Sequence, residues 1–164
     1  MDAIDAIVGR HSVRKYIKAA IPREQLETIV DCGRLAATAV NRQPWEFVVV
    51  TAQAALDELT AICPNNAPFF KDCGAVVLVL SREEKYYLED CAAATQNILI
   101  AATALGLGTC WVAGDKKDYA PAVLSFAGAP GGFRLVSMVG IGVAAEKGNA
   151  PKRKLSEVLH WEQF

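Results

Sequence analysis

The chain is organised around the stretch Arg10-His11-Ser12-Val13-Arg14, which follows a short apolar segment near the N-terminus. Within five residues it supplies two guanidinium groups, one hydroxyl and several backbone N–H groups. Guanidinium forks bind phosphate oxygens in a bidentate way, and a hydroxyl adds a short neutral donor. The stretch therefore predicts a phosphate-binding turn, although a solvated surface turn has the same composition.

The composition indicates one compact domain over residues 1–164 with a large share of apolar residues. Hydrophobic residues make up 52% of the chain, which points to a subunit interface or a cofactor cavity besides the core. The net charge of −1 gives no sign of a nucleic-acid partner. The acidic N-terminus lacks a signal-peptide pattern, and no apolar run reaches the ~18 residues of a membrane span, so no membrane partner is expected.

The cysteines indicate a reducing, cytoplasmic environment. Their number is odd, none form a C-x-x-C pair, and most lie among apolar neighbours, so we expect buried free thiols. The five are Cys32, Cys63, Cys73, Cys91 and Cys110. His11 and His160 are far apart in sequence and have no ligand spacing, so no metal site is expected.

Hydrophobic periodicity predicts helices at residues 2–9, from Pro22 to about residue 38, at 53–62 and at 84–105. The last of these is apolar all round after Asp90, which is typical of a central buried helix. Strands are expected at residues 45–50, 74–80, 109–112 and 135–143. Because helices and strands do not strictly alternate, we expect an α+β fold with one central sheet.

Some of the connecting segments also carry expectations. Asp115 could cap a further helix, which Pro121 would enter early. Gly106 is expected to end the preceding helix as a glycine cap. The glycines that follow it are a poor dinucleotide fingerprint, since they come after a helix and the third glycine is missing.

Two loops carry groups suited to a planar ligand. In Asn41-Arg42-Gln43-Pro44-Trp45, the amides of Asn41 and Gln43 could present donor and acceptor edges to a heterocycle, although a plain turn explains the same residues.

In the later segment Trp111-Val112-Ala113-Gly114, small residues would let the backbone approach a ligand, and a free N–H could meet a ring nitrogen.

Lys152-Arg153-Lys154 is either a solvated charge run or a source of further charge for a phosphate. No nucleophile elbow and no acid–base pair is evident, so chemistry supplied by a cofactor is the better enzyme hypothesis.

Taken in order, these motifs resemble the nitroreductase family of FMN-dependent oxidoreductases. The resemblance rests on residues 10–14 and 41–45, on the run from Asp90 to Trp111, and on the basic residues 152–155. It implies an α+β fold in which helices surround a central, mostly antiparallel sheet. It also implies an intertwined homodimer with two FMN sites at its interface.

The family pattern also implies roles for particular residues. Arg10, Ser12 and Arg14 would hold the phosphate and the polar edge of the flavin, with His11 beside them. The loop from Thr38 to Asn41 would reach the flavin held by the other subunit. The cofactor-binding set is Arg10, His11, Ser12, Arg14, Thr38, Asn41, Gln43, Ala113, Gly114, Lys152 and Arg153.

In this set, the Ala113-Gly114 backbone would face the redox-active ring nitrogen of the flavin. Arg153, with Lys152, would complete the phosphate clamp. Many members have a proline after the basic pair, whereas this chain continues directly to Leu155, so Lys152, Arg153 and Lys154 all stay candidates for the phosphate contact.

The resemblance implies a ping-pong reaction. NAD(P)H would deliver hydride to FMN and leave, and a nitroaromatic, quinone-like or similar acceptor would then take the electrons, with no catalytic side chain assigned. An open substrate pocket would be shaped by Phe69, Phe70, Tyr86 and Tyr87, with core packing as the equal alternative. A non-catalytic protein that stores or senses FMN, and a dimeric scaffold without cofactor, are the competing hypotheses.

Overall fold

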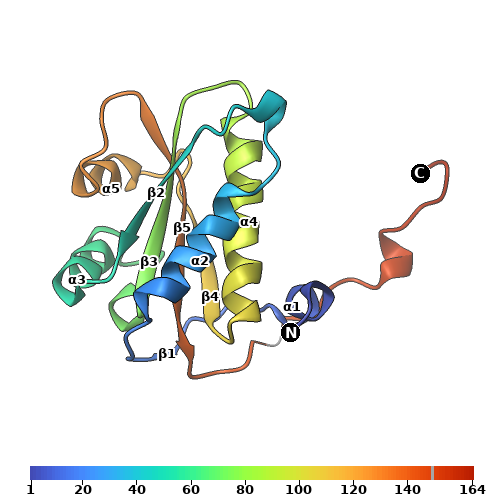
Figure 1. Cartoon of the computed structure of the whole chain (residues 1–164), viewed down its shortest axis with the longest axis horizontal. Coiled ribbons are helices and arrows are strands. Elements are labelled where there is room, and N and C mark those ends of the chain that lie inside the picture. Colours follow the sequence, from blue (N-terminus) through green and yellow to red (C-terminus); the bar gives the residue numbers. More distant parts are fainter. Residues whose placement is uncertain (149) are drawn as a thin grey trace.

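The computed structural model describes residues 1–148 and 150–164 and shows a five-stranded antiparallel sheet between layers of helices (Figure 1). The strands run in the order β1-β5-β3-β2, and β4 also pairs with β5. Their bounds are β1 Tyr16–Ile17, β2 Trp45–Val50, β3 Ala75–Arg82, β4 Gly108–Ala113 and β5 Phe133–Ala144. The α+β class and the antiparallel sheet expected from the sequence are confirmed.

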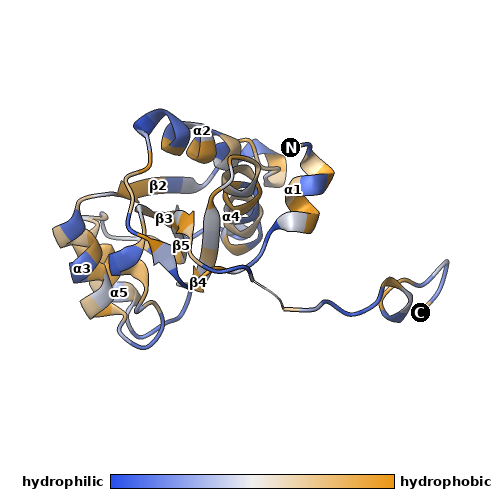
Figure 2. Cartoon of the chain, turned by 90° about the horizontal axis from the view of Figure 1, so that it is seen from below, coloured by the Kyte–Doolittle hydropathy of each residue, from blue (hydrophilic) through white to orange (hydrophobic). Residues whose placement is uncertain are grey.

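Five α-helices and three short 3-10 turns are found among the described residues. The helices are α1 Ala3–Gly9, α2 Arg23–Arg34, α3 Gln53–Ile62, α4 Tyr87–Ala104 and α5 Ala120–Phe126. The 3-10 turns are η1 Ala39–Asn41, η2 Phe70–Asp72 and η3 Leu155–Glu157. Helices α2 and α4 cover one face of the sheet, and α3 and α5 cover the other (Figure 2).

Strand β3 lies at the centre of the core because both of its faces are apolar. Val76, Leu78 and Leu80 pack in the cluster that includes α3 and α5, while Val77 and Val79 pack in the cluster that includes α2 and α4. Alternate side chains of a strand point to opposite faces, so a continuous apolar run is needed where both faces are covered. The prediction of a doubly covered strand is confirmed.

Helix α4 is buried along one stripe rather than all round, which corrects the sequence prediction. Cys91, Ala94, Ile98 and Ala102 recur at helical spacing and are fully buried. At Gly33 of α2 an added Cβ would lie 2.8 Å from an Ile98 carbon, so α2 and α4 pack closely there.

At the element boundaries two features differ from the sequence prediction and one agrees with it. Helix α2 ends at Arg34 rather than near residue 38. Asp115 does not cap α5, whose N-cap is Tyr119; its carboxylate instead accepts a hydrogen bond from the Tyr87 hydroxyl at 2.7 Å. Gly106, with a φ of 79°, follows the end of α4 as the predicted glycine cap.

The C-terminal segment leaves the body of the chain and ends far from it (Figures 1 and 2). Every residue from 151 to 164 is exposed. Its large apolar side chains are Leu155, Val158, Leu159, Trp161 and Phe164. Helix α1 likewise leaves Ile4, Ile7 and Val8 exposed and buries only Ala6. Apolar surface of this extent marks an interaction surface.

Candidate functional site

The Arg10–Arg14 stretch is fixed to the sheet through its central residue. The Val13 N–H donates to the Thr109 carbonyl of β4 at 2.8 Å, and the Tyr16 hydroxyl donates to the Val13 carbonyl at 2.6 Å. The Val13 side chain is buried, while its neighbours Ser12 and Arg14 are exposed. Because successive side chains of an extended segment alternate, this anchor turns the serine and the arginine outward together.

A cleft of about 290 Å³ brings this stretch together with the segment that follows β5. Its lining contains five of the residues predicted for the phosphate site, and both ends of the chain contribute to it. The lining residues are Arg10, His11, Ser12, Arg14, Glu146, Lys147, Gly148, Ala150 and Lys152. An added Cβ at Gly148 would collide with the His11 Cβ, so the close approach of the two segments requires glycine there.

The cleft is dominated by positive charge. Within the residues that the structure describes, Arg10, Arg14 and Lys152 form no ion pair. The one carboxylate in the lining, Glu146, accepts the Arg14 backbone N–H at 3.1 Å and lies 3.8 Å from the Lys15 ammonium. Two guanidinium groups, an ammonium and a hydroxyl around one opening form a donor set suited to a phosphate.

Arg153 lies outside this cleft in the isolated chain. Its guanidinium donates to the Glu157 carbonyl at 2.5 Å and lies 3.7 Å from the Glu157 carboxylate. Of the three basic residues in the run, the structure therefore places Lys152 at the opening. A phosphate contact by Arg153 stays a prediction.

The second predicted region, from Thr38 to Gln43, is held by a residue that the sequence analysis did not assign to the site. The Asp90 carboxylate of α4 accepts the Thr38 hydroxyl at 2.6 Å and the Ala39 N–H at 3.1 and 3.2 Å. The Gln43 N–H in turn donates to the Thr38 hydroxyl oxygen at 3.1 Å. No local sequence signal could reveal this contact, because its partners are about fifty residues apart.

This turn has an unusual backbone. Val40, Asn41 and Gln43 have φ values of 46°, 58° and 50°, in the left-handed region that side-chain-bearing residues rarely adopt. Such conformations persist only where the surroundings hold them, and they cluster at functional sites. The Gln43 amide donates to the Asn41 side-chain oxygen at 3.1 Å, so the two predicted amide groups are partly paired with each other.

Beside this turn lies a second cavity of about 340 Å³. Tyr86 and Tyr87, two of the predicted pocket residues, contribute to its lining together with Arg42. The other two, Phe69 and Phe70, are buried in the core at 7% and 0% exposure, so for them the core-packing alternative is correct. Their rings pack edge to face with centroids 5.3 Å apart.

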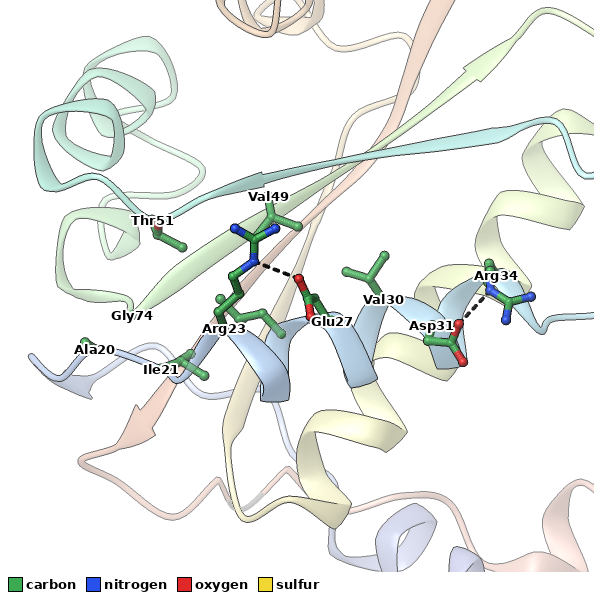
Figure 3. A pocket seen from close by; sticks show the side chains of 11 residues that line it. Ala20, Ile21, Arg23, Glu27, Val30, Asp31, Arg34, Val49, Thr51 and Gly74 are labelled. Atoms are coloured by element: carbon green, nitrogen blue, oxygen red, sulfur yellow. Dashed lines mark hydrogen bonds and ion pairs between the residues drawn. The ribbon is translucent and has the colours of Figure 1, made fainter.

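A further cavity of about 740 Å³ lies between α2 and the region of β2 and Gly74 (Figure 3). Its charged side chains are paired with each other: Arg23 donates to Glu27 at 2.7 Å and Arg34 to Asp31 at 2.6 Å. None of the predicted site residues line it. The cavity therefore contributes nothing to the cationic site.

The cationic cleft and the Thr38–Gln43 turn lie toward opposite ends of α4. Asp90 is in the first turn of that helix, whereas a hollow that shares His11 and Gly148 with the cleft reaches Thr103 in its last turn. Thirteen helical residues correspond to a rise of about 20 Å. One copy of the chain therefore does not bring its two predicted half-sites together.

Comparisons with known proteins identify the family of this chain. Residues 7–67 and 61–143 match the model of the nitroreductase family. The chain belongs to the nitroreductase family. A protein of Methanothermobacter thermautotrophicus named "Putative NADH dehydrogenase/NAD(P)H nitroreductase" is 35% identical over 116 residues, which is 68% of this chain and 60% of that protein. The chain thus spans less than two thirds of that relative.

Solved structures share the nitroreductase fold over the whole chain. A Bacteroides thetaiotaomicron protein of the same name is 29% identical, with a TM-score of 0.91 and coverage of 99% of this chain and 98% of the other. An FMN-dependent nitroreductase of Clostridium difficile has a TM-score of 0.91 at 23% identity and covers 98% and 99% of the two chains. Among the helices described for this nitroreductase-family chain, none is long and apolar enough to cross a membrane.

One predicted contact of this family member needs correction. The Gly114 N–H donates to the Val136 carbonyl of β5 at 3.0 Å, so this N–H is not free to meet a ring nitrogen. An added Cβ at Gly114 would lie 2.5 Å from Leu135 Cγ and 3.0 Å from the Leu135 carbonyl. Glycine is required here by packing against β5. A flavin contact by the backbone of Ala113, whose carbonyl accepts the Tyr119 hydroxyl, stays a prediction.

Proposed function

We propose that this chain is an FMN-dependent oxidoreductase that takes hydride from NAD(P)H and passes it to a nitroaromatic, quinone-like or similar flat acceptor. The observation that carries the proposal is the cationic cleft formed by Arg10, Arg14 and Lys152 with the Ser12 hydroxyl. A phosphate monoester carries about −1.5 to −2 charge, which this donor set matches. Bound FMN would supply the redox chemistry, exchanging hydride with the two substrates in ping-pong order.

The protein's own contribution is binding and orientation. The cations of the cleft would hold the phosphate and so fix one end of the cofactor. Ser12 is aligned for this role because its neighbour Val13 is tied to β4. Basic groups near the polar edge of the flavin would also favour negative charge there. Arg153 is expected to join the cations of the cleft when the C-terminal segment packs against a second copy of the chain.

We also propose that the active form is an intertwined homodimer with cofactor sites between its subunits. The two half-sites lie toward opposite ends of α4, where Asp90 and Thr103 are separated by a rise of about 20 Å, and a second copy related by a two-fold axis can supply the missing half to each. The apolar C-terminal segment, whose residues 151–164 are all exposed in one chain, is suited to wrap around the second copy. Light scattering tests this: the full chain is expected to be dimeric, and a chain ending at residue 150 monomeric or weakly associated.

The acceptor is expected to bind at the cavity beside the Thr38–Gln43 turn. Tyr86 and Tyr87 offer aromatic surfaces there, and Arg42 offers a guanidinium that lies 3.8 Å from the Glu84 carboxylate of the same lining. Aromatic surfaces suit flat, electron-poor substrates. The cytoplasm is the expected compartment, because the five cysteines form no disulfide and four of them are buried.

The decisive experiment is an absorbance spectrum of the purified protein with added FMN, before and after NADH or NADPH under anaerobic conditions. Bleaching of the flavin bands, followed by their return when a nitroaromatic or quinone is added, is the expected result. Colour that persists under an excess of both nicotinamide cofactors would show a non-catalytic FMN-binding protein. Failure to take up FMN would leave only the hypothesis of a dimeric scaffold without a cofactor.

A further inference from the structure

Asp90 is a buried carboxylate with both of its oxygens engaged. It is 7% exposed and lies in the first turn of α4. Oδ2 accepts the Thr38 hydroxyl at 2.6 Å, and the Ala39 N–H reaches both oxygens at 3.1 and 3.2 Å. A buried carboxylate is retained only where such donors compensate for its lost hydration. All of these donors belong to one turn.

The network continues from Asp90 to the far side of that turn. The Thr38 hydroxyl donates a hydrogen bond to Asp90, and the oxygen of the same hydroxyl accepts a hydrogen bond from the Gln43 N–H at 3.1 Å. The residues enclosed by these bonds include Val40 and Asn41, whose φ values are positive. Left-handed conformations at such residues cost of order 1–3 kcal/mol each. The turn therefore needs an external brace, and Asp90 provides it at the end where the turn meets α4.

The braced turn presents its side chains to solvent rather than to its own core. Val40 is 87% exposed, and Asn41 and Arg42 are exposed as well. The turn is strained, and a buried carboxylate holds it on the side that faces the core. Its other side is exposed, which is typical of a segment that is organised to contact a ligand or another chain. In the proposed homodimer that contact is the flavin held by the cleft of the other subunit.

We infer that Asp90 is a positioning residue, which holds the Thr38–Gln43 turn in the shape that meets the cofactor at the subunit interface. The inference rests on the proposed function. Asp90 borders the cavity beside the turn, but both of its oxygens are engaged by Thr38 and Ala39, and the inference assigns to it no contact with the flavin. Its effect passes through Thr38 and Ala39, and its loss would leave the turn free to relax into unstrained conformations.

The chemistry of the network explains why a carboxylate is needed. A carboxylate offers two acceptor oxygens and no donor, which matches the Thr38 hydroxyl and the Ala39 N–H. An asparagine with its oxygen at the Oδ2 position would place its NH2 group where Oδ1 lies 3.1 Å from the Ala39 nitrogen, donor against donor, and the flipped amide would face the Thr38 hydroxyl proton with that NH2 group. Asp90→Asn therefore disrupts the network while the size of the side chain is kept. Thr38→Val removes the hydroxyl at the other end, and Thr38→Ser keeps it.

The test compares FMN dissociation constants by flavin fluorescence for wild type, Asp90→Asn, Thr38→Val and Thr38→Ser. Glu89→Gln is the matched control, since Glu89 is exposed and lies next to Asp90 in α4. If the turn of a variant adopts the FMN-bound conformation in about a tenth of the molecules, the dissociation constant of FMN rises about tenfold. We expect that loss of affinity for Asp90→Asn and Thr38→Val, tighter binding by Thr38→Ser than by Thr38→Val, and wild-type affinity for Glu89→Gln.

A second measurement reports the stability of the turn in protein without cofactor. Hydrogen exchange of the Ala39 and Gln43 amides in FMN-free protein is expected to be at least tenfold faster in Asp90→Asn than in Glu89→Gln. Unchanged FMN affinity in Asp90→Asn, with normal binding by wild type, would refute this inference alone. No FMN binding by wild type would refute the proposed function and the inference with it. If Asp90→Asn does not fold, Thr38→Val supplies the same comparison.

Discussion

Replacing Arg14 by alanine is the most direct test of the phosphate cleft. The Arg14 backbone N–H, which donates to Glu146 at 3.1 Å, is kept in the variant, and so are the Val13 bonds that anchor the Arg10–Arg14 stretch to the sheet. The Arg14 side chain is exposed and forms no ion pair among the described residues, so the free energy of unfolding should change little. Only the guanidinium that faces the cleft is lost.

The size of the effect follows from the bonds that this guanidinium would make. Hydrogen bonds to a charged group contribute about 1.5–3 kcal/mol. Since each 1.4 kcal/mol is a factor of ten, the dissociation constant of FMN is expected to rise roughly ten- to 150-fold. Arg10 and Lys152 stay in the cleft of the variant, so some binding should remain.

Titrations with FMN and with riboflavin separate the phosphate from the ring. Riboflavin lacks the phosphate, so Arg14→Ala should weaken FMN binding far more than riboflavin binding. Arg23→Ala is a suitable control, because Arg23 is an exposed arginine on α2 that pairs with Glu27 outside the cleft. Equal losses for both ligands would refute the assignment of Arg14 to the phosphate, and an unchanged FMN titration would remove it from the site.

Two further predictions concern the core. Burial raises the pKa of the Cys91 thiol to about 11. At pH 8 a thiol reagent should therefore label native protein only at the partly exposed Cys32, and it should label all five cysteines after unfolding. Labelling of the buried thiols should become faster as the pH approaches 11. Gly114→Ala should destabilise the fold by about 1–3 kcal/mol in urea titrations because its Cβ would collide with Leu135, whereas Gly131→Ala, with open space around it, should have little effect.

The sheet was predictable from the sequence where patterns are local and strong. The apolar run of β3 and the β-branched residues of β2 define these strands to within one or two residues, and α3 begins and ends as predicted. Helix α2 was predicted to continue to about residue 38 from the helical spacing of Leu26, Ile29, Val30 and Gly33. It ends at Arg34, and Thr38 is already extended, with a φ of −143°.

A single long-range contact explains both that error and the residue that was missed. Asp90 binds Thr38 and Ala39, which takes the chain away from the axis of α2. In the sequence Asp90 is only an acidic residue in the first turn of a helix, a common position for it. The gathering of cationic residues in one cleft follows from residue types that are visible in the sequence, whereas the contact between Asp90 and the Thr38–Gln43 turn depends on a pairing that only the fold creates.

Helix α4 sets the geometry of the whole site. It keeps the cationic cleft and the Asp90-braced turn of one chain toward its opposite ends, so the proposed two-fold dimer would join the cleft of each copy to the turn of the other. A mixed dimer of Arg14→Ala and Asp90→Asn chains would then have one site with both defects and one with neither. Half of its sites should bind FMN with wild-type affinity. If both half-sites came from the same chain, every site would be impaired, and no wild-type fraction would appear in the titration.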